Sequence, residues 1–169
     1  MRGPRRKEPP TLDEEVRREL AAALLTFDSA TVGAVVSRLG KPGLPAFQDN
    51  AASVAGLLFE RFAGLRGIGR ARILTMSDQE LADGVLVPLR RATAPSAGEA
   101  RSISRQAPRV LREWRRVPGL WPGGGEDSWL FAYVIPAGVH GLTEAGVLDV
   151  QRLVDDWMTD TRDPSVEDC

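Results

Sequence analysis

The stretch RSISRQAPRVLREWRRV, residues 101–117, decides the fold class because its apolar and charged side chains separate onto two faces of a helix. At about 100° per residue, one face carries the apolar side chains Ile103, Ala107, Val110, Trp114 and Val117. The opposite face carries Arg101, Arg105, Arg109, Arg112 and Arg116. The pattern predicts a helix that buries the first face and exposes the second. Pro108 predicts either a kink or a division into two helices near Gln106.

The same periodicity predicts helices in the N-terminal half of the chain. A first helix is expected to begin at Thr11, in a capping box, and a second at residue 28 or 29, to be ended by Gly40. Two prolines and a glycine predict a loop over residues 41–50, with a third helix beginning at residue 49 or 50.

A short glycine-containing segment follows this third helix. In GLRGIGRARIL, residues 64–74, Gly67, Ile68 and Gly69 resemble the turn of a helix-hairpin-helix DNA-binding element. The next cap, at Ser77, leaves no room for the second helix of that element. A glycine C-cap followed by a loop is therefore the favoured interpretation.

The remaining segments mix helical and extended signals. Ser77 starts a short helix that is expected to end near Gly84, because Pro88 is poorly tolerated inside a helix, and residues 85–89 then become extended. WLFAYVI, residues 129–135, is the best strand candidate because it is rich in aromatic and branched residues. A final helix is expected over Thr143–Asp160.

The sequence therefore predicts a mainly α-helical protein with an irregular orthogonal or bundle-like packing of five to six helices, and it leaves open a minor two-stranded β element. Residues 1–10 are expected to form a disordered basic arm, residues 11–161 a single helical domain, and residues 162–169 an acidic flexible tail. The longest uncharged run is shorter than the roughly 20 residues that cross a bilayer. The basic N-terminus is not followed by the apolar stretch of a signal peptide, so we expect a cytoplasmic protein without membrane contact.

Charge is segregated along the chain although the formal net charge is only −1. Residues 90–116 hold eight arginines and two glutamates, whereas residues 117–169 hold two arginines and ten acidic residues. The acidic residues expected to cluster on one face of the last helix, within residues 149–163, include Asp149, Asp156 and Asp160. This segregation indicates partners, inside or outside the chain, rather than a fold.

Three interpretations of the arginine stripe compete. The arginines form a solvated face that the acidic C-terminal helix partly neutralises, or they bind an acidic protein surface, or they contact nucleic-acid phosphates. As the functional prediction we favour a protein-protein interaction or adaptor module whose partner is another protein or a second copy of the chain. Nucleic-acid binding is the alternative. The sequence pI near 5.9 and the acidic C-terminal segment disfavour a polyanionic ligand.

Conventional catalytic groups are scarce, so we expect a non-enzymatic protein. The chain has one histidine, one tyrosine and a single cysteine at its last position. His140 is the remaining candidate for a general base, which makes an enzyme the third alternative. Phosphate-loop and zinc-ligand patterns are missing from the sequence, so neither cofactor nor metal is expected.

Overall fold

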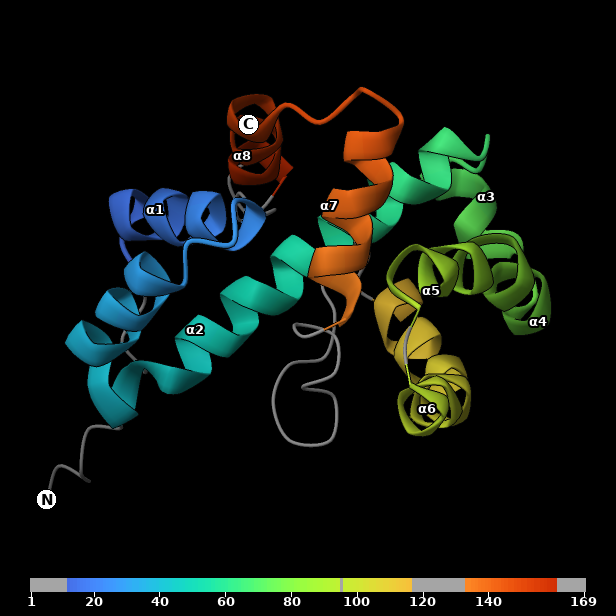
Figure 1. Ribbon diagram of the computed structural model, residues 1–169, viewed down its shortest axis with the longest axis horizontal. Coiled ribbons are helices and arrows are strands. Elements are labelled where there is room, and N and C mark those ends of the chain that lie inside the picture. The colour runs from blue at the N-terminus through green and yellow to red at the C-terminus, as the bar shows by residue number, and fades with distance from the viewer. Residues whose placement is uncertain (1–11, 95, 117–132, 161–169) are drawn as a thin grey trace, which may run out of the picture.

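The structure is a computed structural model that describes residues 12–94, 96–116 and 133–160, and throughout these ranges the regular elements are helical. In chain order they are α1 (Glu14–Leu25), α2 (Ser29–Leu65), α3 (Arg70–Thr75), α4 (Asp78–Leu81), the π-helical turn η1 (Ala82–Leu86), α5 (Val87–Thr93), α6 (Ala97–Arg116), α7 (Ile135–Glu144) and α8 (Val150–Asp160) (Figure 1). The mainly α-helical prediction is confirmed. The helices are more numerous than the five to six expected, because residues 70–93 form several short ones.

Helix α2 runs through the middle of the molecule and organises the packing (Figure 1). Helices α1 and α7 pack against α2, α8 packs against α1, and α5 packs against α7. The crossing of α7 over α2 is close, because a Cβ atom added at Gly138 would lie 2.9 Å from the Cβ of Leu58. Side chains from α1 to α8 contribute to one buried apolar cluster. That cluster fixes the orientation of the outer helices, including α6.

The loop expected over residues 41–50 is wrong, because the chain returns to helix directly after a kink at Gly40. Gly40 has φ 62° and ψ −170°, a conformation open almost exclusively to glycine. Pro42 falls in the first turn after the kink, where helices leave backbone N–H groups without partners. Pro45 lies just beyond that turn, where a proline removes one backbone hydrogen bond. The helix nevertheless continues through both prolines to Leu65.

Replacing Gly40 with alanine is expected to lower the free energy of unfolding by about 1–3 kcal/mol, because the alanine Cβ strains this backbone conformation. Gly33 provides the matched control: it has no positive φ, and a Cβ placed there meets no atom within 4 Å. Gly33→Ala is expected to raise stability by up to about 1 kcal/mol through helix propensity. Urea unfolding followed by circular dichroism measures both, and equal effects of the two changes would contradict the assignment of the kink.

The extended segment expected at residues 85–89 is also wrong. Ser77 caps α4 as predicted, since its Oγ accepts a hydrogen bond of 3.1 Å from the Glu80 N–H. The chain then passes through the wider turn η1 into α5, and Pro88 falls in the first turn of α5, where its missing N–H costs little. Val85, Leu86 and Leu89 are buried along one side of this continuous helical path.

The strand candidate at residues 129–135 and the start of the last helix need correction as well. Tyr133 and Val134 lie in a helical turn that leads into α7, so a strand is wrong for residues 133–135, while residues 129–132 fall outside the described residues. The final helix begins at Val150 instead of Thr143, because Gly146 with φ 70° ends α7 and the Asp149 carboxylate accepts from the Arg152 N–H.

The ends of α1, α2 and α6 agree with expectation only in part. Asp13 caps α1 by accepting from the Val16 N–H, and Thr11 lies outside the described residues. Gly67 has φ 76° and ends α2, which confirms the glycine C-cap. A short connection follows, but the expectation that no second helix fits before Ser77 is wrong, because α3 occupies Arg70–Thr75. The proposed division of the helix near Gln106 is wrong too, because α6 continues through Pro108 to Arg116.

Candidate functional site

Helix α6 buries the apolar face that the sequence predicts. Ile103, Ala107, Val110 and Trp114 are at most 5% exposed, and Val117 lies outside the described residues. The Trp114 ring packs edge-on against Phe59 of α2, with the ring centroids 5.8 Å apart. This apolar contact fixes the rotation of α6 about its axis and thereby determines which side chains face outward.

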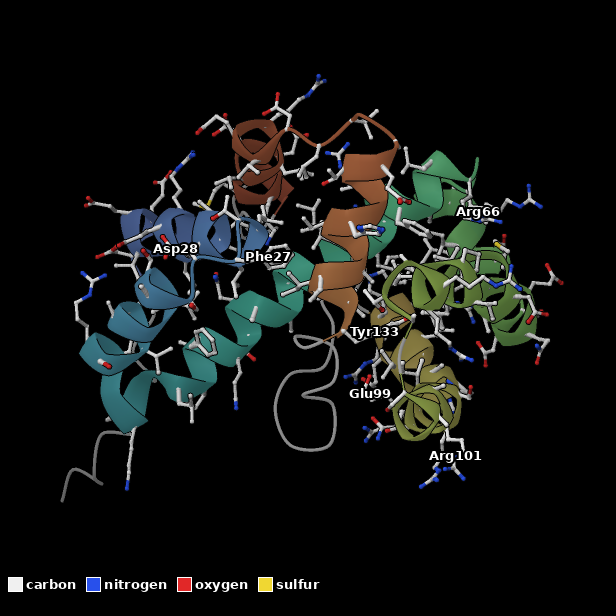
Figure 2. The ribbon with its side chains drawn as sticks, in the orientation of Figure 1. Phe27, Asp28, Arg66, Glu99, Arg101 and Tyr133 are labelled. Atoms are coloured by element: carbon white, nitrogen blue, oxygen red, sulfur yellow. The ribbon has the colours of Figure 1, made fainter. Side chains whose placement is uncertain are left out.

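The opposite side of α6 presents the five arginines named by the pattern, here called the arginine face. All five are exposed: Arg101, Arg105, Arg109, Arg112 and Arg116. At about 1.5 Å of rise per residue they span roughly 22 Å of helix. Arg116 pairs with Glu113 at 2.8 Å, and the Arg101 side chain projects away from the body of the molecule (Figure 2). In the described part of the chain, no ion pair joins Arg105 or Arg112 to a carboxylate.

Arg115 has a different role, which the wheel pattern did not reveal. Its Nη1 donates to Asp78 at 2.5 Å, its Nε to the Ile73 carbonyl at 3.2 Å, and its Nη2 to the Met76 carbonyl at 2.7 Å. The side chain is only 19% exposed. Arg115 therefore ties α6 to the α3–α4 connection. On the helical wheel Arg115 lies between the apolar face and the arginine face, which sets it apart from the other arginines. Its partners could not be predicted, because they lie about 40 residues earlier in the chain.

Two of the acidic residues expected on the last helix, Asp149 and Asp156, have partners within the fold. Asp156 pairs with Arg61 of α2, Asp149 caps α8, and the Asp160 side chain lies outside the described residues. Asp149 and Asp156 also line a pocket of about 380 Å³ between α2 and α8. Figure 1 shows α8 and α6 on different sides of the molecule, separated by α2 and α7. The structure thus does not bring the two charged faces together.

A neighbouring acid on α8 shows the same internal pairing. Asp155 accepts a hydrogen bond of 2.7 Å from Arg18 of α1, and this bond holds the pKa of the Asp155 carboxyl below its usual value. A lowered carboxyl pKa adds stability above the unfolded-state pKa, and that stability is lost as the pH falls through the folded-state pKa. Because the pair is solvent-exposed, its contribution is small.

A groove runs beside the arginine face, between α6 and the segment α4–η1–α5, with a volume of about 220 Å³. Apolar residues that are at most 5% exposed form its floor, among them Leu86, Ile103, Ala107 and Leu111. Its walls carry polar and charged side chains. Ser104 lies at its edge, where the hydroxyl accepts a hydrogen bond of 2.8 Å from Arg90 of α5. Asp78 and Asp83 lie on the far wall. The sequence pattern could not locate this groove because three separate segments line it.

The groups considered for catalysis are dispersed. His140 is exposed on α7 and its Nε2 lies 3.2 Å from a carboxylate oxygen of Glu144, one helical turn along. Burial raises the pKa of Tyr133 to about 12, so this phenol stays protonated near neutral pH. The described residues contain no cluster of three potential metal ligands. Within the same ranges, no helix combines the length and apolar character needed to span a membrane.

Comparisons with protein-family models, curated proteins and solved structures found no match to this chain.

Proposed function

We propose that the protein is a non-catalytic interaction module that binds an acidic segment of a protein partner through the arginine face of α6. The observation that carries this proposal is the alignment of five exposed arginines along one side of a helix whose other side is locked into the core. Such an arrangement holds the backbone positions that carry the five arginines in a fixed row of roughly 22 Å. An acidic helix with carboxylates at every fourth residue repeats its charges at the same interval.

Acidic residues of α8 are paired with arginines elsewhere in the fold, which supports a partner for the arginine face outside the chain. Asp155 and Asp156 of α8 already pair with Arg18 and Arg61. These exposed pairs are individually weak, but they reduce the negative charge that α8 offers to other groups. The arginine face is therefore the better candidate for recognising a separate acidic surface.

Carboxylates around the arginine face favour a protein over a nucleic acid. Glu99 is exposed on α6 itself and Asp83 lies across the adjacent groove, while Arg116 and Arg115 partly neutralise the nearby Glu113 and Asp78. A continuous phosphate backbone would approach these carboxylates and be repelled by them. A protein surface can place its acids opposite the arginines and leave neutral groups opposite the carboxylates.

Charge reversal on the arginine face tests the proposal. The probe is a fluorescein-labelled, alanine-based helical peptide with glutamate at every fourth position, titrated by fluorescence anisotropy. Changing Arg105 and Arg112 together to glutamate is expected to weaken binding at least about tenfold, since two attractions become repulsions. Reversing Arg72 and Arg152, two exposed arginines on α3 and α8, makes the same change in net charge and is expected to have a much smaller effect.

Two results would contradict the proposal. Equal losses for the two double variants would mean that net charge, and not the arginine face, controls binding. Tighter binding of a labelled 20-base-pair DNA duplex, with an affinity that drops steeply as salt rises, would favour the nucleic-acid alternative. Circular dichroism spectra of both variants establish that helicity is retained.

A further inference from the structure

The groove beside α6 is continuous with the arginine face. On the helix wheel, Ser104 and Pro108 lie between the groove floor and the arginines, and both line the groove. Ser104 and Pro108 are exposed, whereas Ile103, Ala107 and Leu111 behind them are buried. A partner that lies along the arginines therefore has a recess directly at its side, with an apolar floor and polar walls.

Proline at position 108 adds two features to the edge of this recess. Its exposed ring extends the apolar surface outward from the floor. It also lacks the N–H that a regular α-helix would donate to the Ser104 carbonyl. The edge of the groove beside the arginines is therefore partly apolar.

The size of the groove indicates the kind of group that fits. Pockets for cofactors and drug-sized ligands typically enclose about 300–1,000 Å³, and this groove has about 220 Å³. A single leucine, methionine or phenylalanine side chain suits it better than a small-molecule ligand. Recognition of a helix by one groove commonly uses such apolar anchors.

We infer that this groove receives one large apolar side chain from the acidic partner, and that the partner is an amphipathic helix with carboxylates facing the arginines and the anchor on the adjacent flank. The inference rests on the proposed function and adds the source of specificity. Charge complementarity contributes to the choice of partner, because the arginines attract an acidic helix face. The carboxylate of Asp83 on the far wall disfavours a helix that carries acids on its anchor flank as well, whereas Asp78 on the same wall is paired with Arg115.

Two labelled peptides separate the anchor from the charge. One is the alanine-based helix with glutamate at every fourth position, and the other is identical except for one leucine on the flank beside the glutamates. The leucine peptide is expected to bind the wild-type protein at least about tenfold more tightly, since burial of one leucine supplies that much affinity. Ser104→Trp fills the groove from α6 and is expected to abolish the leucine advantage while binding of the parent peptide persists.

The controls address the fold and the location. Ser102→Trp places the same side chain on the other flank of α6, away from the groove, and is expected to preserve the leucine advantage. Ala82→Phe fills the groove from the opposite wall and is expected to abolish the tighter binding of the leucine peptide as well. It replaces Ser104→Trp as the test if that variant does not fold. Thermal unfolding identifies a misfolded variant.

The outcomes distinguish this inference from the proposed function. If neither peptide binds the wild-type protein, the proposed function itself is wrong. If both peptides bind equally and charge reversal weakens both, the arginine face binds acids but the groove receives no anchor. A leucine advantage that survives both Ser104→Trp and Ala82→Phe in folded protein places the anchor elsewhere and overturns the inference.

Discussion

Replacing Trp157 with alanine is expected to lower the free energy of unfolding by about 3–5 kcal/mol, the range typical of large buried aromatics. Trp157 is 2% exposed on α8, and its Nε1 donates a hydrogen bond of 2.8 Å to the buried Ser53 hydroxyl of α2. The guanidinium of Arg17 on α1 lies 4.9 Å from the ring centroid. One side chain therefore joins three helices, and its removal leaves both a cavity and an unpaired hydroxyl.

The conservative variant separates these contributions. Trp157→Phe retains an aromatic ring but loses the indole N–H, so a smaller cost of about 1–3 kcal/mol is expected from the unpaired Ser53 hydroxyl and the reduced volume. Guanidinium unfolding monitored by circular dichroism measures both variants. A loss below about 1 kcal/mol for Trp157→Ala would mean that α8 does not dock through this residue.

The parts of the fold that the sequence predicts well are those in which one helix has two chemically distinct faces. Helix α6 is the clearest case, because its apolar positions recur at helical spacing over twenty residues and its exposed positions are charged. The buried side of α6 and the arginine face could therefore both be predicted. No neighbouring segment is needed to make that assignment.

Short apolar runs misled the prediction at residues 85–89 and 133–135. A run that is buried on several sides lacks periodicity, so a strand and a buried helical turn give the same pattern. Proline added to the error, because Pro42, Pro88 and Pro136 lie near the starts of helical segments, where the missing N–H is tolerated. Whether a proline begins a helix or breaks one depends on the turn before it, such as the kink at Gly40 or the wide turn η1.

The candidate site was predictable only in part for a related reason. Exposed arginines follow from the periodicity of α6 alone, but the groove exists only where α4, η1 and α5 approach α6. Likewise, the partner of Asp156 is Arg61 of α2, so the sequence could not show that this acid is paired within the fold. Tertiary neighbours decide which charged groups remain available to a partner.

Replacement by alanine is expected to affect mainly stability at Arg115 and mainly binding at Arg112, although the two residues lie three positions apart on one helix. Arg115→Ala is expected to lower the free energy of unfolding by about 2–3 kcal/mol, because it leaves the Ile73 and Met76 carbonyls without this donor and Asp78 without its cation. Arg112→Ala is expected to change stability by no more than about 0.5 kcal/mol, as exposed substitutions usually do. Urea unfolding of both variants measures the difference.

Binding provides the reverse comparison. Arg112→Ala is expected to weaken binding of the glutamate-bearing peptide by severalfold, because it removes one exposed charge from the arginine face. Arg115→Ala, measured well below its unfolding midpoint, is expected to weaken binding less, since its guanidinium is committed to Asp78. If the two variants lose stability equally, the anchoring role of Arg115 is wrong; if they lose binding equally, the arginine face extends to a residue that the geometry places outside it. The two measurements together therefore separate the arginine that stabilises the fold from those available to a partner.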